Sequence, residues 1–197
     1  DIGYNRRYAY FSKIIKSIIS KNKVYHLTFF VKELKLPETH WYFWPNQVTR
    51  ITGNLTHWID LLKFFFEDIK IEKIALSGSE NNLSISMLCD NEMLVDFIST
   101  DYGNDIKGVY ELIKIIFNNF NVDLYDFRKL KIDGVRYNKT IRNVRRDKGH
   151  YNMYKTLINN LKTKKEPVYP VEDIYWVTKL TNQLTALLND THDNKKT

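Results

Sequence analysis

The chain has 197 residues, of which 43% are hydrophobic and 27% charged, as is ordinary for a globular protein with one substantial core. No apolar run approaches the ~20 residues that cross a bilayer, and no apolar signal segment follows residues 1–7, so we expect neither a membrane span nor a secretory leader. The net charge of +7 is uneven, because the stretch 128–165 carries +11 and the remainder −4.

The first part of the chain predicts two helices that flank a strand. Apolar residues at helical spacing predict an amphipathic helix at 6–20, and β-branched and aromatic residues predict a strand at 23–34. The loop 35–50 carries a cluster of aromatic residues that either roof a core or line a pocket: Trp41, Tyr42, Phe43 and Trp44. Residues 53–66 predict a helix that is apolar on nearly every side and therefore buried.

The middle of the chain predicts a series of short strands, at 71–77, 83–89, 93–99, 110–117, 122–125, 130–132 and 135–137. Turn-forming pairs separate neighbouring strands, namely Asp90-Asn91, Asn118-Asn119 and Asp133-Gly134, the last being the strongest hairpin signal. Because nothing between these strands is long enough for a parallel crossover, we expect mostly antiparallel pairing. The single Cys89 lies in an apolar run, so we expect a buried thiol and a reducing, cytoplasmic setting.

Two helices are predicted near the end of the chain. Asp147 is a candidate N-cap for a helix at 148–162, whose inner face we expect to be Tyr151, Tyr154, Leu157, Ile158 and Leu161. A last helix at 171–188 has Ile174, Val177, Leu184 and Leu188 on one stripe. The order of elements predicts one α+β domain over 1–190 with a polar tail at 191–197, built on an open, mostly antiparallel sheet with helices on one face. The other face is then amphipathic or covered by a partner.

Generic motifs do not identify a chemistry. The sequence has no glycine-rich phosphate loop, no paired His or Cys spacing for a metal and no serine-hydrolase elbow, so we predict no metal site. Asn54, His57 and Asp60 follow one another at intervals of three and share a broad face of the buried helix. His57 is then either a proton-transfer group in a dry environment or a structural histidine bonded to a backbone carbonyl.

Three segments in chain order, GYNRRY at 3–8, RITGNLTHWIDL at 50–61 and RDKGH at 146–150, together resemble the C-terminal domain of the glucose–fructose oxidoreductase/inositol dehydrogenase (Gfo/Idh/MocA) family. GYNRRY at 3–8 resembles the segment where that family's chain leaves its Rossmann domain, and RITGNLTHWIDL at 50–61 resembles the segment with its catalytic histidine. RDKGH at 146–150 is similar to its "DKGH" helix, and YDFRKL at 125–130 to a hairpin of some members. The likeness spans nearly the whole chain.

The resemblance implies an NAD- or NADP-dependent oxidoreductase that acts on a sugar, inositol or nucleotide-sugar hydroxyl. It implies that His57 is the general acid/base, while hydride passes to or from nicotinamide. It implies substrate contacts at Asn54, Asp60, His40 and Trp41, and dinucleotide contacts at Asn5 and Arg6, with Asp60 more an orienting partner than a catalyst.

The sequence departs from the family at several positions. Gly53 stands where many members have an aspartate, and Val48 and Thr49 stand where many have two glycines. The family's dinucleotide-binding domain and its catalytic lysine would precede Asp1, so we expect a fragment or processed product that alone neither binds the dinucleotide tightly nor turns over. The family also implies a homo-oligomer through the open sheet face.

A second hypothesis is a non-catalytic binding or assembly module. Its basic stretch, 128–165, would contact polyanions with an affinity that falls steeply with salt and does not depend on His57. A solvated basic face is the simpler interpretation of this stretch, and we do not expect nucleic acid as a partner.

Overall fold

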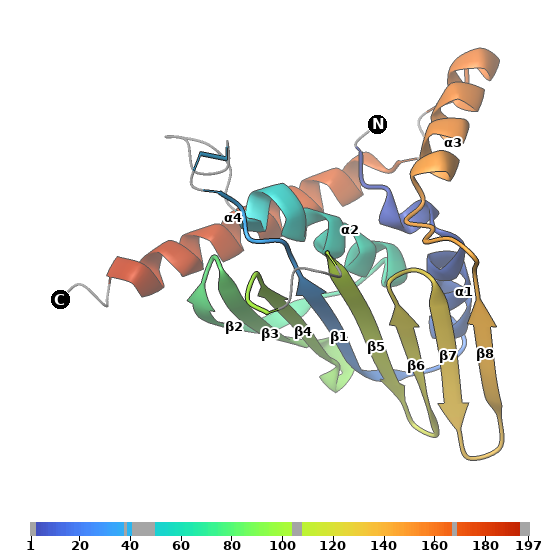
Figure 1. Ribbon diagram of the computed structural model, residues 1–197, viewed down its shortest axis with the longest axis horizontal. Coiled ribbons are helices and arrows are strands. Elements are labelled where there is room, and N and C mark those ends of the chain that lie inside the picture. Colours follow the sequence, from blue (N-terminus) through green and yellow to red (C-terminus); the bar gives the residue numbers. More distant parts are fainter. Residues whose placement is uncertain (1–2, 38, 41–49, 104–107, 167–168, 194–197) are drawn as a thin grey trace.

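The computed structural model describes residues 3–37, 39–40, 50–103, 108–166 and 169–193. Within them, eight strands form one open sheet in the order β2-β3-β4-β1-β5-β6-β7-β8 (Figure 1). Their bounds are β1 (Val24–Lys32), β2 (Ile71–Ser79), β3 (Asn82–Cys89), β4 (Leu94–Thr100), β5 (Tyr110–Phe117), β6 (Phe120–Tyr125), β7 (Lys129–Gly134) and β8 (Asn138–Arg142). The α+β class with a mostly antiparallel sheet is confirmed.

One pair of strands, β1 and β4, is parallel, with His26 opposite Leu94 and Lys32 opposite Thr100. A parallel pair needs a long crossover. Here the crossover contains a helix and the β2–β3 hairpin, a route that the antiparallel prediction did not consider because it treated the first strand apart from the others.

The helical elements are η1 (Arg6–Tyr8), α1 (Tyr10–Ile19), the π-helical turn η3 (Ile51–Leu55), α2 (Thr56–Phe65), the short turn η4 (Asp90–Glu92), α3 (His150–Thr163) and α4 (Val171–Asp193). Helices α1, α2 and α4 lie on one face of the sheet, and α3 extends away from it (Figure 1). No described helix covers the opposite face of the sheet. None of the helices in the described part of the chain combines the length and hydrophobicity that a bilayer crossing demands.

The core lies between the sheet and α2. Phe29 of β1 stacks on Phe97 of β4, with 4.8 Å between ring centroids, and packs against Trp58 of α2 at 5.7 Å. The prediction that this helix is buried is confirmed, because Trp58, Ile59, Leu61 and Leu62 are all 0% exposed. Cys89 is also buried, and burial raises the pKa of its thiol to about 12.

The predicted strand at 135–137 is wrong. Strand β7 continues through Gly134, and residues 135–137 form the turn, which is closed by backbone hydrogen bonds between Gly134 and Tyr137. Gly134 serves a close approach, since a Cβ there would lie 2.8 Å from the Cβ of Phe120. The real second strand, β8, was missed because it is a polar edge strand in which Ile141 alone is apolar, which leaves no alternation to detect.

The prediction that Asp147 caps the helix at 148–162 is also wrong. One oxygen of its carboxylate accepts a hydrogen bond from the Gly149 backbone, and the other accepts one from the Tyr10 backbone at the start of α1. The helix predicted from residue 6 is broken at extended Ala9, so α1 begins at Tyr10 and Asp147 caps it from far along the chain. Gly149, with φ of +89°, precedes α3 instead.

Four of the five residues predicted for the inner face of α3 point outward, and the fifth, Leu157, is half-buried. Tyr151, Tyr154, Ile158 and Leu161 are 75%, 57%, 51% and 70% exposed, whereas Asn160 is buried. In contrast, the predicted stripe of α4 is largely confirmed, since Val177, Leu184 and Leu188 are buried.

Candidate functional site

His57 is the second residue of α2 and directly follows the π-helical turn η3. Such turns are frequent at functional sites. Because Trp58 and Ile59 are fully buried, the start of α2 is fixed, and the half-buried ring of His57 lies against the edge of Tyr4, with 5.4 Å between ring centroids. The N-terminal segment and α2 together therefore enclose the imidazole.

A buried ion cluster lies beside His57. The guanidinium of Arg6 donates to Glu111 Oε1 at 2.6 Å, and the Lys148 ammonium donates to the same oxygen at 2.8 Å. Arg6 also lies over the ring of Trp58, 4.2 Å from its centroid. Burial alone would raise the pKa of Glu111, which is 1% exposed, but Arg6 and Lys148 hold it below its usual value. Two cations around one carboxylate leave the site positive.

The imidazole of His57 is neutral in this setting. Burial, followed by the positive charge of Arg6 and by His150, lowers its pKa from 6.5 to about 4. Its Nδ1 is buried and has no hydrogen-bond partner in the described part of the chain, and neither does Glu111 Oε2. Unpaired buried polar atoms are costly and are found at sites that receive a ligand or partner. The structure thus lacks the backbone-carbonyl bond of a purely structural histidine among the described residues.

We predict that this neutral histidine makes stability depend on pH. Between pH 6.5 and about 4 the unfolded chain binds a proton at His57 that the folded chain does not, so stability is full above pH 6.5 and is lost as the pH falls. At ~1.4 kcal/mol per pKa unit, the loss at about pH 4.5 is about 2–3 kcal/mol. Urea unfolding of the wild type and His57→Gln, above pH 6.5 and at about pH 4.5, measures this loss of stability. If the variant lost as much stability at the lower pH as the wild type, another group would be responsible.

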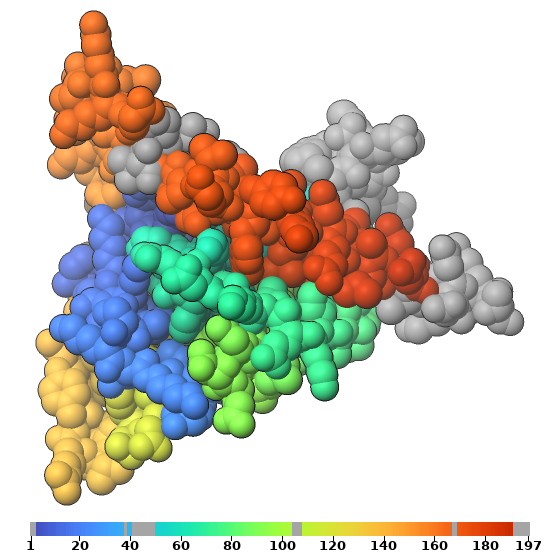
Figure 2. Space-filling view, turned by 180° about the vertical axis from the view of Figure 1, so that it is seen from behind, coloured from blue at the N-terminus to red at the C-terminus, as the bar shows by residue number. Residues whose placement is uncertain are grey.

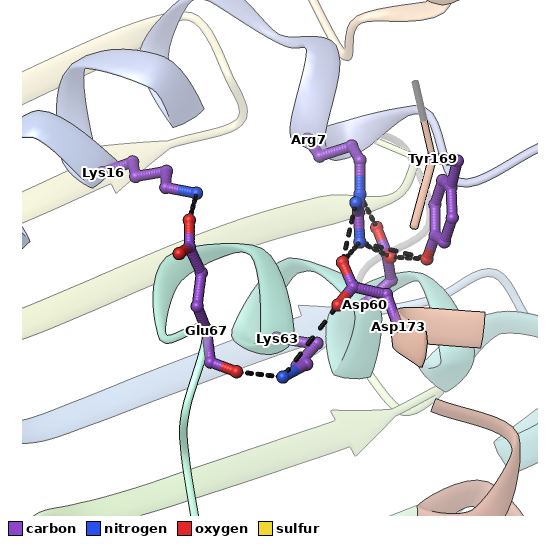
Figure 3. Close-up of polar contacts among 7 residues, drawn as sticks. All are labelled: Arg7, Lys16, Asp60, Lys63, Glu67, Tyr169 and Asp173. Atoms are coloured by element: carbon purple, nitrogen blue, oxygen red, sulfur yellow. Dashed lines mark hydrogen bonds and ion pairs between the residues drawn. The ribbon is translucent and has the colours of Figure 1, made fainter. Parts of the chain in front are cut away.

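Asp60 lies one turn after His57 and belongs to a second buried cluster (Figure 3). Its carboxylate accepts hydrogen bonds from Nε and Nη2 of Arg7, the former at 3.0 Å, and from the Tyr169 hydroxyl. Arg7 also donates to Asp173 at 3.1 Å and lies 3.9 Å from the Tyr169 ring centroid. Asp60 is 0% exposed and, through these bonds, ties the N-terminal segment to α2 and α4, while any contact with a substrate stays a proposal.

The two residues expected at the dinucleotide are also held inside the fold. Asn5, 2% exposed, donates from its side-chain amide to the Lys148 carbonyl at 2.7 Å, and Arg6 is in the cluster with Glu111. Asn5 thereby holds the segment around Lys148, whose positive charge acts on His57. Their placement shows what positions the site, and any contact with a dinucleotide stays a proposal.

The expected substrate residues are only partly located. Asn54 is half-buried within the π-helical turn, one turn before His57. His40 is half-buried, and its backbone amide donates to the Pro37 carbonyl at 2.8 Å. Trp41, with the rest of the aromatic cluster, lies outside the described residues.

Sequence reasoning missed Glu111, Lys148 and Tyr4 as parts of the site. Glu111 did carry a signal, because it occupies an inward position of β5, whose other inward residues are apolar. Lys148 and Tyr4 lay within motifs that carried the family resemblance, but no role was assigned to them. Within the described residues no group of three or more His, Cys, Asp or Glu side chains is arranged to hold a metal ion.

The basic stretch 128–165 is partly neutralised by internal ion pairs. Lys131 pairs with Asp133, Arg146 pairs with Asp126 at 3.3 Å, and Lys148 pairs with Glu111. These pairs reduce the charge that the stretch offers to a polyanion.

No protein-family model matches the chain. No curated protein sequence matches it. Solved structures do match. The dehydrogenase MviM from Clostridium difficile has a TM-score of 0.71 at 15% identity, with 93% of this chain and 60% of that chain covered. UDP-N-acetylglucosamine 3-dehydrogenase GnnA from Acidithiobacillus ferrooxidans has a TM-score of 0.72 at 10% identity, with 92% and 59% covered. An inositol dehydrogenase homolog complexed with NAD+ from Azotobacter vinelandii has a TM-score of 0.61 at 12% identity, with 71% and 42% covered.

This chain therefore spans about 60% of the length of MviM and of GnnA. At these identities the likeness establishes the fold. The fold is the one that the sequence resemblance led us to expect, a domain found in dehydrogenases of greater length.

Proposed function

We propose that this chain is the C-terminal, substrate-binding domain of an NAD(P)-dependent oxidoreductase that acts on a sugar, inositol or nucleotide-sugar hydroxyl. The observation that carries the proposal is His57, a neutral, enclosed imidazole with an unpaired Nδ1, on a fold shared with dehydrogenases. Two of the similar proteins, an inositol dehydrogenase homolog and a UDP-N-acetylglucosamine dehydrogenase, support the substrate class.

In this proposal His57 handles the proton of the reacting hydroxyl. A neutral imidazole accepts that proton when the hydroxyl is oxidised and returns it in the opposite direction. The nicotinamide supplies or accepts the hydride when it is bound. Glu111 pairs with Arg6 and Lys148 but offsets their charges only in part, so the remaining positive charge, together with burial, keeps His57 neutral.

The remaining residues then act around His57. We propose that Asn54 faces the substrate from the preceding turn and that His40 and Trp41 belong to the substrate loop. Asn5 and Arg6 serve the dinucleotide through the segment that they hold in place. Since the sequence carries no glycine-rich phosphate loop, we propose that a Rossmann domain, linked on the N-terminal side, provides most of the dinucleotide site.

We also propose that the open face of the sheet pairs with a second copy of the chain. No described element covers that face, and it presents apolar side chains from the central strands, namely Phe30, Leu94, Ile98, Leu112 and Ile116. Leu94, the first residue of β4, is 45% exposed. An uncovered apolar face of this kind is typical of an oligomer interface.

The proposal predicts that the natural polypeptide containing this chain reduces NAD+ or NADP+ when it is offered an oxidisable polyol. Absorbance of the reduced nicotinamide, measured with inositols, aldoses and UDP-sugars, tests this. We expect saturable turnover with one substrate class and, from this chain alone, none. A polypeptide that binds neither dinucleotide, but binds a polyanion with strongly salt-dependent affinity, would instead support the binding-module hypothesis.

A further inference from the structure

Helix α3 carries a stripe of four exposed aromatic and aliphatic side chains on the side away from the rest of the molecule. Tyr151, Tyr154, Ile158 and Leu161 follow at spacings of three, four and three residues, which places them on one stripe of the helix. All four are more than half exposed. The helix projects from the body in the ribbon and in the space-filling view, so no described element packs on this stripe (Figures 1 and 2).

The opposite side of α3, which faces the body, mixes polar residues with the half-buried Met153 and Leu157. Asn152 donates to the Tyr8 carbonyl at 3.2 Å, and Asn160 is 7% exposed. A surface helix of a globular protein normally shows the reverse arrangement, with its apolar stripe toward the core. The orientation of α3 is therefore the one expected for a helix whose partner surface lies outside this chain.

The base of α3 adjoins the His57 site. The helix begins at His150, two residues after Lys148, whose ammonium reaches Glu111. The segment around Asn5 lies against the same base, because Asn5 donates to the Lys148 carbonyl. In Figure 1 the N-terminal end of the chain and α3 lie on the same side of the molecule. A domain that approached His57 from this side would also contact the exposed stripe of α3.

We propose that the exposed stripe of α3 is the docking surface for the dinucleotide-binding domain. This inference rests on the proposed function, which requires such a domain to approach His57. It agrees with the lengths of the similar structures, of which this chain spans about 60%, so that each contains a further body of substantial size. The position of the stripe places the dinucleotide-binding domain on one side of α3.

Charge argues against a second copy of the chain as the occupant. Lys155 and Lys162 are exposed beside the stripe, and Lys164 and Lys165 follow the helix. Two copies packed through α3 would bring these like charges together, which is unfavourable. The dinucleotide-binding domain is accordingly expected to present an apolar patch with an acidic rim.

Hydrogen–deuterium exchange of the α3 amides tests the proposal, with this 197-residue chain and the natural polypeptide compared under one condition. We expect exchange to be about tenfold slower or more in the natural polypeptide, because docking suppresses local opening of the helix. In the natural polypeptide, the double substitution Tyr154→Ser and Ile158→Ser should restore fast exchange of the α3 amides. The stability of the 197-residue chain should stay unchanged, since both side chains are already exposed. Leu94→Ser, on the open sheet face, is the matched control: it should leave α3 protection unaltered and weaken only self-association.

Two results would overturn the docking surface. One is equal exchange of α3 in both proteins, including the case in which the natural polypeptide has no further domain. The other is protection of α3 in this chain alone that rises with protein concentration, which would identify a second copy as the occupant. The proposed function can fail separately from the docking surface. If α3 is protected in a polypeptide that neither binds nor reduces a dinucleotide, the proposed function is wrong but α3 is still a docking surface. If the enzyme is active and α3 is unprotected, the proposed function stands and the docking surface is wrong.

Discussion

Replacement of Asp60 by alanine should lower the free energy of unfolding by about 3–5 kcal/mol, the usual cost of removing one partner from a buried ion pair. Asp60 is fully buried and accepts hydrogen bonds from two guanidinium nitrogens of Arg7 and from Tyr169. Without it, Arg7 keeps Asp173 as a partner but loses its bidentate carboxylate, and Tyr169 loses its acceptor. The cluster joins three separate segments of the chain, so the whole helical layer should be weakened.

Urea denaturation of the wild type and Asp60→Ala measures this loss, with Glu67→Ala as the matched control. Glu67 also pairs with a basic residue, Lys16, at 2.7 Å, but its side chain is 75% exposed (Figure 3). An exposed pair contributes about 1 kcal/mol or less. If Asp60→Ala were no more harmful than Glu67→Ala, the anchoring role assigned to Asp60 would be wrong.

Replacement of His57 by glutamine in the natural polypeptide should lower kcat by about 10²–10⁴, the range for loss of a general acid or base. Glutamine fills a similar volume and has hydrogen-bonding atoms, but it does not carry a proton between substrate and water. The dinucleotide affinity should be unchanged, because the proposed dinucleotide site comes from another domain. Steady-state kinetics together with equilibrium dinucleotide binding separates the two effects.

His26→Gln is the control for histidine replacement in general. His26 pairs with Asp96 at 2.5 Å on the open sheet face, away from the helix that carries His57. We expect this variant to retain wild-type turnover. A similar loss in both variants would indicate damage to the fold or to assembly, and would remove the support for His57 as the proton carrier.

Local patterns predicted the elements that carry their own packing signal. Helix α2 was predicted from its apolar residues, and the β3–β4 connection from Asp90-Asn91, where Asn91 has a φ of 59°. Strand β8 carries no such signal, because its polar residues lie at the edge of the sheet and bury little. The prediction of which side of α3 faces the core was wrong for a related reason. An apolar stripe indicates that a helix packs against something, but not whether that partner belongs to the same chain.

The candidate site was predicted only as far as the local sequence reaches. His57 was singled out by its place on an apolar helix and by the family resemblance. The Arg7–Asp60 pair joins residues 53 positions apart, and Arg6–Glu111 joins residues 105 apart. Local spacing in the sequence does not indicate such long-range ion pairs, so they were not predicted. Asp60 was therefore expected to contact the substrate. The inward Glu111 shows that a charged residue at an apolar position of a strand is a usable signal.

The central claim is that His57 carries the proton of the reaction, and a single-turnover measurement tests it most directly. Steady-state rates of many dehydrogenases are limited by product release, whereas hydride transfer in a preformed complex isolates the chemical step. We expect His57→Gln to slow this step by about 100-fold or more while the complex still forms with wild-type affinity. Hydride transfer at the wild-type rate in His57→Gln would contradict the claim.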